Sequence, residues 1–291
     1  MMGGFACKMG CLYLTIFTGC AAGQVLSMGP DTSTSTQKAQ HACMWDEAVC
    51  QRGNKVSIGS VATDSDMSKL DARQDVKELW FMFEPAQGFG ATELWDKSPK
   101  IGDAGFAHIR NLRDLEKLDA LHLPLLTDDA LRNLSELQQL LEVRFDHNRN
   151  FTDAGLAHLQ HLTRLQTVTF YGSPITDRGI LYLRELIDLQ NLELGWSLIT
   201  DEGAREIAQF RNLKILDLQG TKVTNGGVVY LATLPRLEWL ALTNTSVTEQ
   251  GILALRSVST LHDLYITRGT VDEMSITSLE RSLPGLRVHF E

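Results

Sequence analysis

The sequence has little basic charge, and most of it has no cysteine. Its 27 Lys and Arg residues are outnumbered by 36 Asp and Glu residues, which gives a formal net charge of −9. A general nucleic-acid binder needs a basic surface to neutralise phosphates, so the composition excludes that class and favours a basic or neutral partner. All five cysteines lie at positions 7 to 50, so no thiol is available to the rest of the chain. At 43% apolar and 22% charged residues, the composition is otherwise typical of a soluble globular protein.

A long apolar run lies near the N-terminus, where CLYLTIFT follows the cation Lys8. This layout is typical of a signal peptide, which we place at residues 1–19. Its end, FTGC, resembles the lipobox of bacterial lipoproteins, although phenylalanine stands where leucine is usual. The resemblance implies that Cys20 carries a lipid and becomes the mature N-terminus, anchored in the cell envelope. A cleaved secretory signal and an uncleaved membrane anchor are the alternatives, and both also place the protein outside the cytoplasm.

Residues 20–75 are expected to form a lipid-anchored linker and an N-terminal cap. The stretch DTSTSTQ lacks the apolar content needed to pack, so it should act as a flexible tether. Cys43 and Cys50 remain after removal of the leader. An exported compartment permits a disulfide between them, and two free thiols are the alternative.

A 24-residue pattern recurs through the rest of the chain. The stretch LKILDLQGTKVTNGGVVYLATLPR, residues 213–236, is followed at once by LEWLALTNTSVTEQGILALRSVST, with apolar residues at the same offsets. When the first residue of a unit is offset 0, offsets 3 and 5 carry the period of a strand, and offsets 15, 18 and 21 carry helical spacing. A strand and a helix in so few residues cannot bury both apolar faces alone, so neighbouring units must stack into a solenoid.

The repeated residues resemble those of the leucine-rich repeat family. The pattern LxxLxLxxT appears at residues 213–221 and again at 237–245. The second half of each unit resembles the bacterial surface type with ITDxGL, as in ITDRGI at 175–180 and ITDEGA at 199–204. The resemblance implies an α/β solenoid, or horseshoe, with a parallel concave sheet and convex helices. We expect this domain over residues 76–291, as about eight repeats and a terminal strand.

Three segments depart from the repeat. The first unit contains a long insertion at residues 84–100, which either binds a ligand or covers the open end of that unit. The stretch DSDMSKLDARQ, residues 64–74, could form a capping helix, because a terminal repeat needs a polar outer face. At the other end, Val288 and Phe290 fall at offsets 3 and 5, which predicts a last strand that closes the array.

The ITDxGL stretch supplies the start of each helix. A threonine such as Thr176 can accept a hydrogen bond from a backbone amide of the first turn. The next residue, such as Asp177, places negative charge at the positive end of the helix, and the glycine allows close approach between turns. A calcium ladder of these aspartates is the alternative, but Asn225 and Glu249 stand at this position in two units.

The family fold implies that offsets 2, 4 and 6 line the concave face. Seven acidic and two basic residues occupy these offsets, so we expect a negative, solvent-exposed surface that is interrupted by aromatic rings. Aromatic residues are enriched at binding hot spots. The candidate binding residues are Trp80, Tyr171, Glu193, Trp196, Asp217, Trp239, Asp263 and Tyr265. We expect Trp239 and Tyr265, flanked by Asp217 and Asp263, to be the energetic centre.

No catalytic, metal-binding or cofactor-binding pattern is recognisable. His158 and His161 share a helix face, but no cysteine or carboxylate completes a metal site, and the other six histidines form no pattern. The sequence therefore favours a non-enzymatic protein-interaction module that needs no cofactor. Glycan binding is the alternative, in which Asn191, Gln219 and Thr243 would supply hydrogen bonds beside the aromatic rings.

Overall fold

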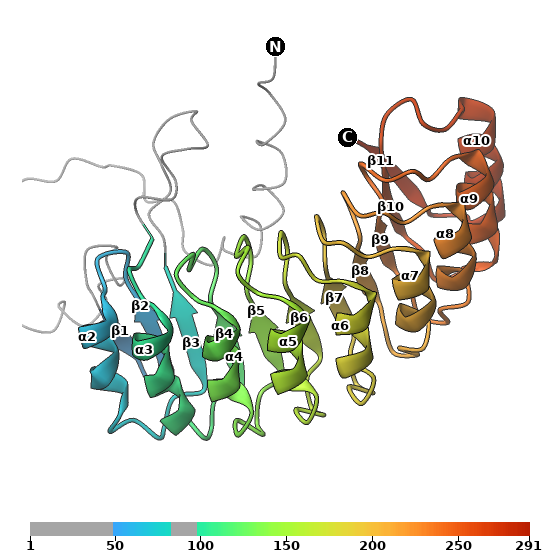
Figure 1. Ribbon diagram of the computed structural model, residues 1–291. Coiled ribbons are helices and arrows are strands. Elements are labelled where there is room, and N and C mark those ends of the chain that lie inside the picture. Colours follow the sequence, from blue (N-terminus) through green and yellow to red (C-terminus); the bar gives the residue numbers. More distant parts are fainter. Residues whose placement is uncertain (1–48, 83–97) are drawn as a thin grey trace, which may run out of the picture.

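The computed structural model describes residues 49–82 and 98–291, which form a single row of strands and short helices (Figure 1). The strands are β1 Val49–Arg52, β2 Lys55–Ile58, β3 Glu78–Phe81, β4 Lys117–Asp119, β5 Glu142–Arg144, β6 Thr167–Thr169, β7 Asn191–Glu193, β8 Ile215–Asp217, β9 Trp239–Ala241, β10 Asp263–Ile266 and β11 Arg287–Phe290. The α-helices are α2 Asp64–Met67, α3 Asp103–Phe106, α4 Asp128–Leu131, α5 Asp153–Leu156, α6 Asp177–Tyr182, α7 Asp201–Ile207, α8 Asn225–Leu231, α9 Glu249–Ala254 and α10 Glu273–Ser282. Short 3-10 helices are η2 Ser68–Leu70, η4 Ala107–Asn111, η5 Arg132–Leu134, η6 Ala157–Leu159 and η7 Leu255–Ser257.

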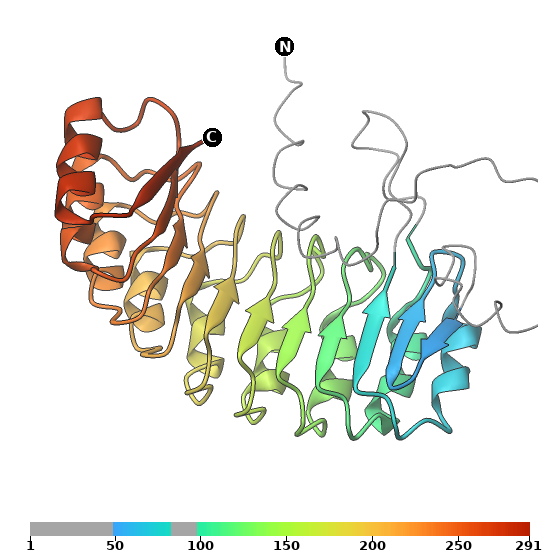
Figure 2. The same cartoon turned by 180° about the vertical axis from the view of Figure 1, so that it is seen from behind.

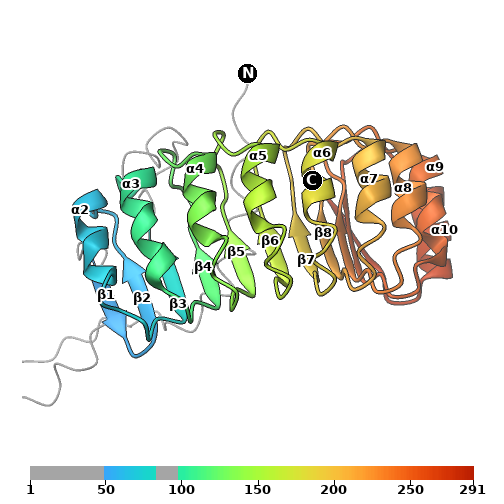
Figure 3. The same cartoon turned by 60° about the horizontal axis from the view of Figure 1, so that its bottom comes forward.

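All of these strands belong to one sheet, and their order in the sheet is their order in the sequence. β1 pairs antiparallel with β2, whereas each later strand pairs parallel with the one before it. Leu192, Leu216 and Leu240 are direct partners on successive strands, so the register is constant from one repeat to the next. The helices line one side of the sheet (Figure 3). The fold is the α/β leucine-rich repeat solenoid that the sequence predicts.

The apolar offsets form the core between the sheet and the helices. Leu216 of β8 and Leu218, which follows the end of this strand, are buried, as are Val228 and Leu231 of α8. Each buried leucine side chain contributes about 2 kcal/mol through the hydrophobic effect. Because side chains alternate along a strand, burial of offsets 3 and 5 turns offsets 2 and 4 toward the other side of the sheet.

The sheet begins before residue 76, where the sequence suggested the first repeat. β1 and β2 form a hairpin through Gly53, whose φ of 58° is left-handed. Val56 and Ile58 of β2 are buried like offsets 3 and 5 of a repeat. The period is hidden in the sequence because Gly53 stands at the position of the first leucine. The helix suggested for residues 64–74 is shorter, since α2 is followed directly by η2.

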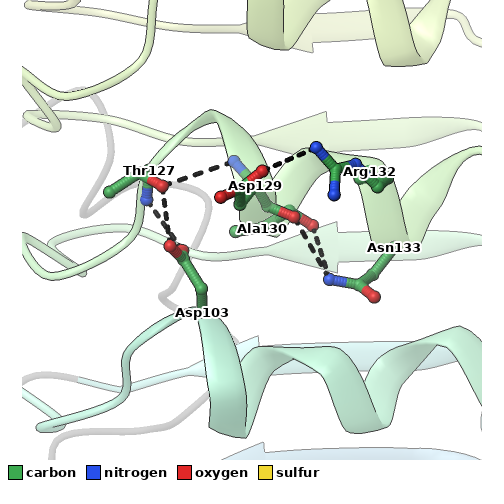
Figure 4. A network of polar contacts seen from close by, with 6 residues as sticks. All are labelled: Asp103, Thr127, Asp129, Ala130, Arg132 and Asn133. Carbon is green, nitrogen blue, oxygen red and sulfur yellow. Dashed lines mark hydrogen bonds and ion pairs between the residues drawn. The ribbon is translucent and has the colours of Figure 1, made fainter.

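The aspartate of each ITDxGL stretch joins its own unit to the next one. Asp103 accepts hydrogen bonds from the Thr127 backbone N–H at 2.9 Å and from the Thr127 hydroxyl at 2.6 Å (Figure 4). The Thr127 hydroxyl in turn accepts from the Asp129 N–H at 3.3 Å, as expected of a helix cap. The same pairing recurs between Asp128 and Thr152, Asp153 and Thr176, Asp177 and Thr200, and Asp201 and Thr224. The aspartates therefore do more than meet the helix dipole, which was the role expected from the sequence.

The glycine of the motif is required by the same aspartate. A Cβ atom at Gly179 would lie 2.6 Å from Asp153 Oδ1, and one at Gly203 would lie 2.3 Å from Asp177 Oδ1. Such distances are well below van der Waals contact, so any residue larger than glycine would clash with the carboxylate. The expected close approach between turns is thereby confirmed and has a specific cause.

Several expectations concern residues outside the described ranges. The signal peptide at 1–19, Cys20, the tether, Cys43 and most of the insertion at 84–100 all lie there. Cys50, in β1, is disulfide-bonded, and its pairing with Cys43 stays a prediction. Among the helices of residues 49–82 and 98–291, none is long and apolar enough to cross a membrane.

Candidate ligand-binding face

The candidate site is the face of the sheet turned away from the helices, here called the concave face (Figure 2). The constant register lines up its side chains in rows across the strands. One row carries Arg144, Thr169, Glu193, Asp217 and Ala241 on β5 to β9. The predicted binding residues are spread along this face and do not form a single site.

Three aromatic rings lie against one another across β9, β10 and β11, and we call them the C-terminal cluster. The ring centroids of Trp239 and Tyr265 are 4.9 Å apart, and those of Tyr265 and His289 are 4.3 Å apart with nearly parallel planes. All three residues are only partly buried. The expected contact between Trp239 and Tyr265 is present, and His289 extends it by one strand. Sequence reasoning missed His289 because the last strand lies outside the complete repeats.

Asp263 fixes the polar edge of the C-terminal cluster. Its carboxylate is 2.6 Å from Arg287 Nη2 and 2.8 Å from His289 Nε2. Partial burial opposes ionisation, but the hydrogen bonds from Arg287 and His289 outweigh it and lower the pKa of Asp263. This carboxylate therefore stays charged and holds the imidazole of His289 beside Tyr265.

A second group of rings lies where β4 to β7 end, and we call His122, His147, Tyr171 and Trp196 the rim cluster. The rings of His122 and His147 stack with centroids 4.9 Å apart, and His147 meets Tyr171 edge-on at 5.1 Å. Burial lowers the pKa of His122 to about 4 and also lowers the pKa of His147, so both rings are neutral at pH 7. The expectation that these histidines form no pattern is wrong, because they occupy the same offset in successive units.

Trp196 is an exposed aromatic residue of the rim cluster. Its side chain is 52% exposed, and its backbone has a φ of 60°, a left-handed conformation that is rare for a bulky residue. Two glycines make room for the rings: a Cβ atom at Gly220 would lie 2.5 Å from the Trp196 indole, and one at Gly195 would lie 2.6 Å from the Tyr171 ring. The left-handed backbone recurs at this offset in other units, at His122, His147 and Asn244, so the exposure of its indole is what makes Trp196 a candidate contact residue.

The concave face is much less acidic than the sequence suggests. Asp119, Asp146 and Asp217 are buried, and Asp217 is only 5% exposed, so its expected position on the solvent-exposed surface is wrong. Burial raises the pKa of Asp119 to about 6 and the pKa of Asp217 to about 7. Burial also raises the pKa of Asp146 well above its ordinary value, and its Oδ1 has no hydrogen-bond partner. Offset counting alone could not reveal this burial.

The remaining acids of this face have polar partners. Glu78 lies 3.4 Å from Lys55 Nζ, and Glu142 lies 2.7 Å from Lys117 Nζ. Glu193 accepts a hydrogen bond from the Asn191 side chain at 2.9 Å. Paired and buried carboxyl groups attract a basic partner weakly, so the face offers mainly apolar contacts.

Trp80 belongs to neither cluster. It lies on β3, near the N-terminal end of the sheet, with Lys55 Nζ 4.0 Å from the centroid of its ring. Its indole N–H donates to Glu78 at 3.2 Å. Trp80 is therefore engaged within its own end of the array, far along the sheet from β9.

Metal chemistry has no support in the described part of the chain, where no group of three or more His, Cys, Asp or Glu residues could hold an ion. His158 lies in η6, on the helical side of the molecule, and His161 is exposed just after it. Neither histidine is near the concave face.

Comparison with known proteins identifies the fold. No protein-family model matches the chain, and no curated protein matches its sequence. An internalin C2 from Listeria monocytogenes is similar over 73% of this chain and 80% of its own, with 21% identity and a TM-score of 0.53. A second internalin from the same species matches over 76% of this chain and 62% of its own, with 18% identity and a TM-score of 0.51. A leucine-rich repeat protein of Leptospira interrogans matches over 80% and 58%, with 18% identity and a TM-score of 0.52. At these identities, the likeness shows the leucine-rich repeat fold alone.

Proposed function

We propose that the protein is a non-enzymatic interaction module that binds a protein partner on its concave face. The observation that carries the proposal is the C-terminal cluster, in which Trp239, Tyr265 and His289 present contiguous, partly exposed rings. Exposed apolar patches mark interaction sites, and aromatic residues dominate binding hot spots. Solenoid proteins use their extended concave surfaces for binding.

The partner should be neutral or weakly basic, and it should bind mainly through apolar contacts. Three of the seven concave acids are buried with a raised pKa, and others are paired with Lys55, Lys117 and Arg287. Salt screens exposed charges strongly but hardly affects apolar burial. Affinity should therefore change little as the ionic strength rises.

A glycan is the second candidate, and the rim cluster is the observation that favours it. The exposed indole of Trp196 lies beside a hydrogen-bonded pair, in which Gln219 Nε2 donates to the Tyr171 hydroxyl at 3.0 Å. An exposed indole suits the apolar face of a sugar ring. Gln219 and Thr243 are only 3% and 0% exposed, so the expectation that they supply hydrogen bonds to a glycan is wrong. The two candidates use different clusters, so variants of Trp196 and Trp239 distinguish them.

Affinity capture with the purified full-length chain tests the proposal. We expect a protein partner whose binding is saturable and is lost in the Trp239→Ala variant but kept in the Trp196→Ala variant. Retention on envelope polysaccharide that depends on Trp196 would instead favour the glycan. Partner binding that neither variant changes would contradict both candidates.

We also propose that the protein is tethered to the cell envelope through Cys20. The motif FTGC and the apolar run before it support this anchor. The Cys20→Ser variant should lose lipid labelling and leave the membrane fraction. If the parent protein takes up no lipid label and the variant stays in the membrane, an uncleaved anchor explains the leader instead.

A further inference from the structure

Asn225 begins α8, on the helical side of the molecule, at the offset where most units carry an aspartate (Figure 1). It is the only asparagine of the sequence that is followed by glycine. Such an asparagine is chemically labile, because glycine has no Cβ atom to hinder attack of its amide nitrogen on the asparagine side chain. Gly226 follows Asn225, whereas a larger residue stands at this offset in other units, as in Ala154, Arg178, Glu202 and Gln250.

Two backbone N–H groups hold the carbonyl group of the Asn225 side chain. Its Oδ1 accepts hydrogen bonds from the Thr248 N–H at 2.9 Å and from the Gly251 N–H at 3.2 Å. A pair of such donors stabilises the oxyanion that forms when a nucleophile attacks an amide carbon. The side-chain carbonyl carbon, Cγ, is therefore activated toward the amide nitrogen of the next residue.

A hydroxyl and a carboxylate lie beside the amide of Gly226. The Gly226 N–H donates to Thr224 Oγ1 at 3.2 Å, and the Thr224 hydroxyl donates to Asp201 Oδ2 at 2.6 Å. A Cβ atom at Gly226 would lie 2.8 Å from the same carboxylate oxygen, so Gly226 and Asp201 are close neighbours. This arrangement suits general-base catalysis, in which the proton of the amide passes to Thr224 and the hydroxyl proton of Thr224 passes to Asp201.

We propose that the folded protein converts its own Asn225 into an aspartate. The Gly226 nitrogen forms a bond to Cγ of Asn225 and gives up its proton through Thr224 to Asp201. The Cγ–Nδ2 bond breaks, and the side-chain nitrogen takes up this proton and leaves as ammonia, which produces a cyclic succinimide. A water molecule then adds to Cγ, the bond between Cγ and the Gly226 nitrogen breaks, and a proton of the water returns to that nitrogen. The net reaction consumes water and releases ammonia, with no oxidant or reductant.

The product would match the pairing of the other units. Asn225 Nδ2 donates to the Thr248 hydroxyl at 2.9 Å, and no backbone N–H of α9, a helix that the structure describes in full, donates to that hydroxyl. At Thr152, Thr176 and Thr200 the hydroxyl instead donates to an aspartate and accepts from the helix that follows. An aspartate at position 225 would accept from the Thr248 hydroxyl and leave its oxygen free to cap α9, which stabilises the junction between the two units.

The contacts of Oδ1 also select between two products. Hydrolysis of the succinimide at Cγ gives aspartate, whereas hydrolysis at the backbone carbonyl gives isoaspartate, with an extra methylene in the main chain at the start of α8. The N–H groups of Thr248 and Gly251 favour attack of water at Cγ, because they stabilise the charge that develops on Oδ1. The fold therefore directs the reaction to aspartate. The conversion lies on the helical side and does not depend on the proposed function.

Peptide mapping by mass spectrometry during incubation of the full-length chain at neutral pH tests the conversion. We expect the peptide with Asn225 to gain the mass difference between an amide and a carboxyl group, with aspartate as the main product and release of an equal amount of ammonia. The melting temperature of the parent should rise toward that of the Asn225→Asp variant. An unchanged mass at Asn225, or isoaspartate as the main product, overturns the inference.

Gly226→Ala is the control for the nucleophile. Alanine fits at this offset, since Ala154 occupies it in another unit, so the variant should fold and keep its amide at Asn225. Conversion of Gly226→Ala at the rate of the parent would contradict attack by the Gly226 nitrogen.

Two threonine variants test the proton transfer. Thr224→Val removes the hydroxyl between Gly226 and Asp201 and should slow the conversion about a hundredfold, as expected for the loss of a general base. Thr176→Val removes the same pairing and the same helix cap two repeats earlier and should convert like the parent. Equal rates in the two variants, or faster conversion in urea than in the folded chain, would show that the fold does not promote the reaction.

Discussion

The indole of Trp196 lies directly against the backbone of Gly220, in the next repeat. A Cβ atom at Gly220 would lie 2.5 Å from Cδ2 of the indole, and the φ of Gly220 is +65°. The glycine therefore permits both the left-handed turn at the end of β8 and the position of an exposed aromatic ring. Fold and candidate site depend on the same residue.

Gly220→Ala should destabilise the protein and displace Trp196. The left-handed backbone alone costs about 1 kcal/mol for alanine, and the clash with the indole adds to this. Urea unfolding measures the loss of stability. The fluorescence difference between Gly220→Ala and the double variant that also carries Trp196→Phe reports the surroundings of the Trp196 ring.

Gly269→Ala is the matched control. Gly269 has a φ of +83°, but a Cβ atom there would meet nothing within 4 Å. This variant should show the backbone cost without a fluorescence change. Equal costs for the two variants would show that the Trp196 ring can move freely away from Gly220.

Asp153→Ala should cost about 2 kcal/mol of unfolding free energy. The change removes two hydrogen bonds to Thr176, at 2.8 and 2.6 Å, each worth about 1 kcal/mol. Asp153→Asn should cost much less, because the protein already uses an amide at this position. Asn225 Oδ1 accepts from the Thr248 N–H, and Asn225 Nδ2 donates to the Thr248 hydroxyl, both at 2.9 Å.

Asp129→Ala provides the control for the loss of an exposed carboxylate. Asp129 pairs only with Arg132 one turn away, and such a surface pair contributes about 0.5 kcal/mol or less. Chemical denaturation of Asp153→Ala, Asp153→Asn and Asp129→Ala measures the loss of unfolding free energy in each variant. Asn and Ala variants of Asp153 with equal stability would contradict the pairing between repeats.

Asp217→Asn should change how stability depends on pH. Burial raises the pKa of Asp217 to about 7, whereas an unfolded aspartate titrates near 3.8, so the folded state holds the extra proton between these values. Stability from this group is therefore full below about pH 4 and is lost as the pH rises toward 7. The asparagine variant keeps an acceptor for the Gln219 N–H, which lies 2.9 Å from Asp217 Oδ1, and has no proton to lose.

The measurement is the difference in unfolding free energy between the variant and the parent at pH 5, 6, 7 and 8. The variant should gain up to about 1.4 kcal/mol per pH unit relative to the parent as the pH rises toward 7. The difference is needed because His122, whose pKa is lowered to about 4, titrates with the opposite sign in the same range. A difference that does not vary with pH would mean that Asp217 is ionised throughout.

The repeating part of the fold could be predicted because each unit has apolar residues and motif residues at the same offsets. Leu216 and Leu218 sit at strand spacing, and the glycine and threonine of each ITDxGL stretch follow at fixed offsets. The unit around β2 could not be recognised, because Gly53 replaces the first leucine and only Val56 and Ile58 remain of its strand pattern. Periodicity reveals a repeat only where its residues are regular.

The candidate site was less predictable because it depends on which side chains of the concave face are buried beneath their neighbours and which remain exposed. Offset counting put Trp239 and Tyr265 side by side, as the parallel register requires. It also put Asp217 in solvent, whereas that residue is buried. The stacking of His122 on His147 needed their left-handed backbone, which the sequence did not indicate.

The measurement that tests the central claim most directly is the affinity of the captured partner for three forms of the full-length chain: the parent, the Trp239→Ala and Tyr265→Ala double variant, and the His158→Ala variant. The double variant should bind more weakly by about 2 kcal/mol or more, the usual threshold for hot spots, with its melting transition kept. His158→Ala, on the helical side, should bind like the parent. Unchanged affinity in the double variant, together with loss of binding in His158→Ala, would contradict the claim that the concave face binds the partner.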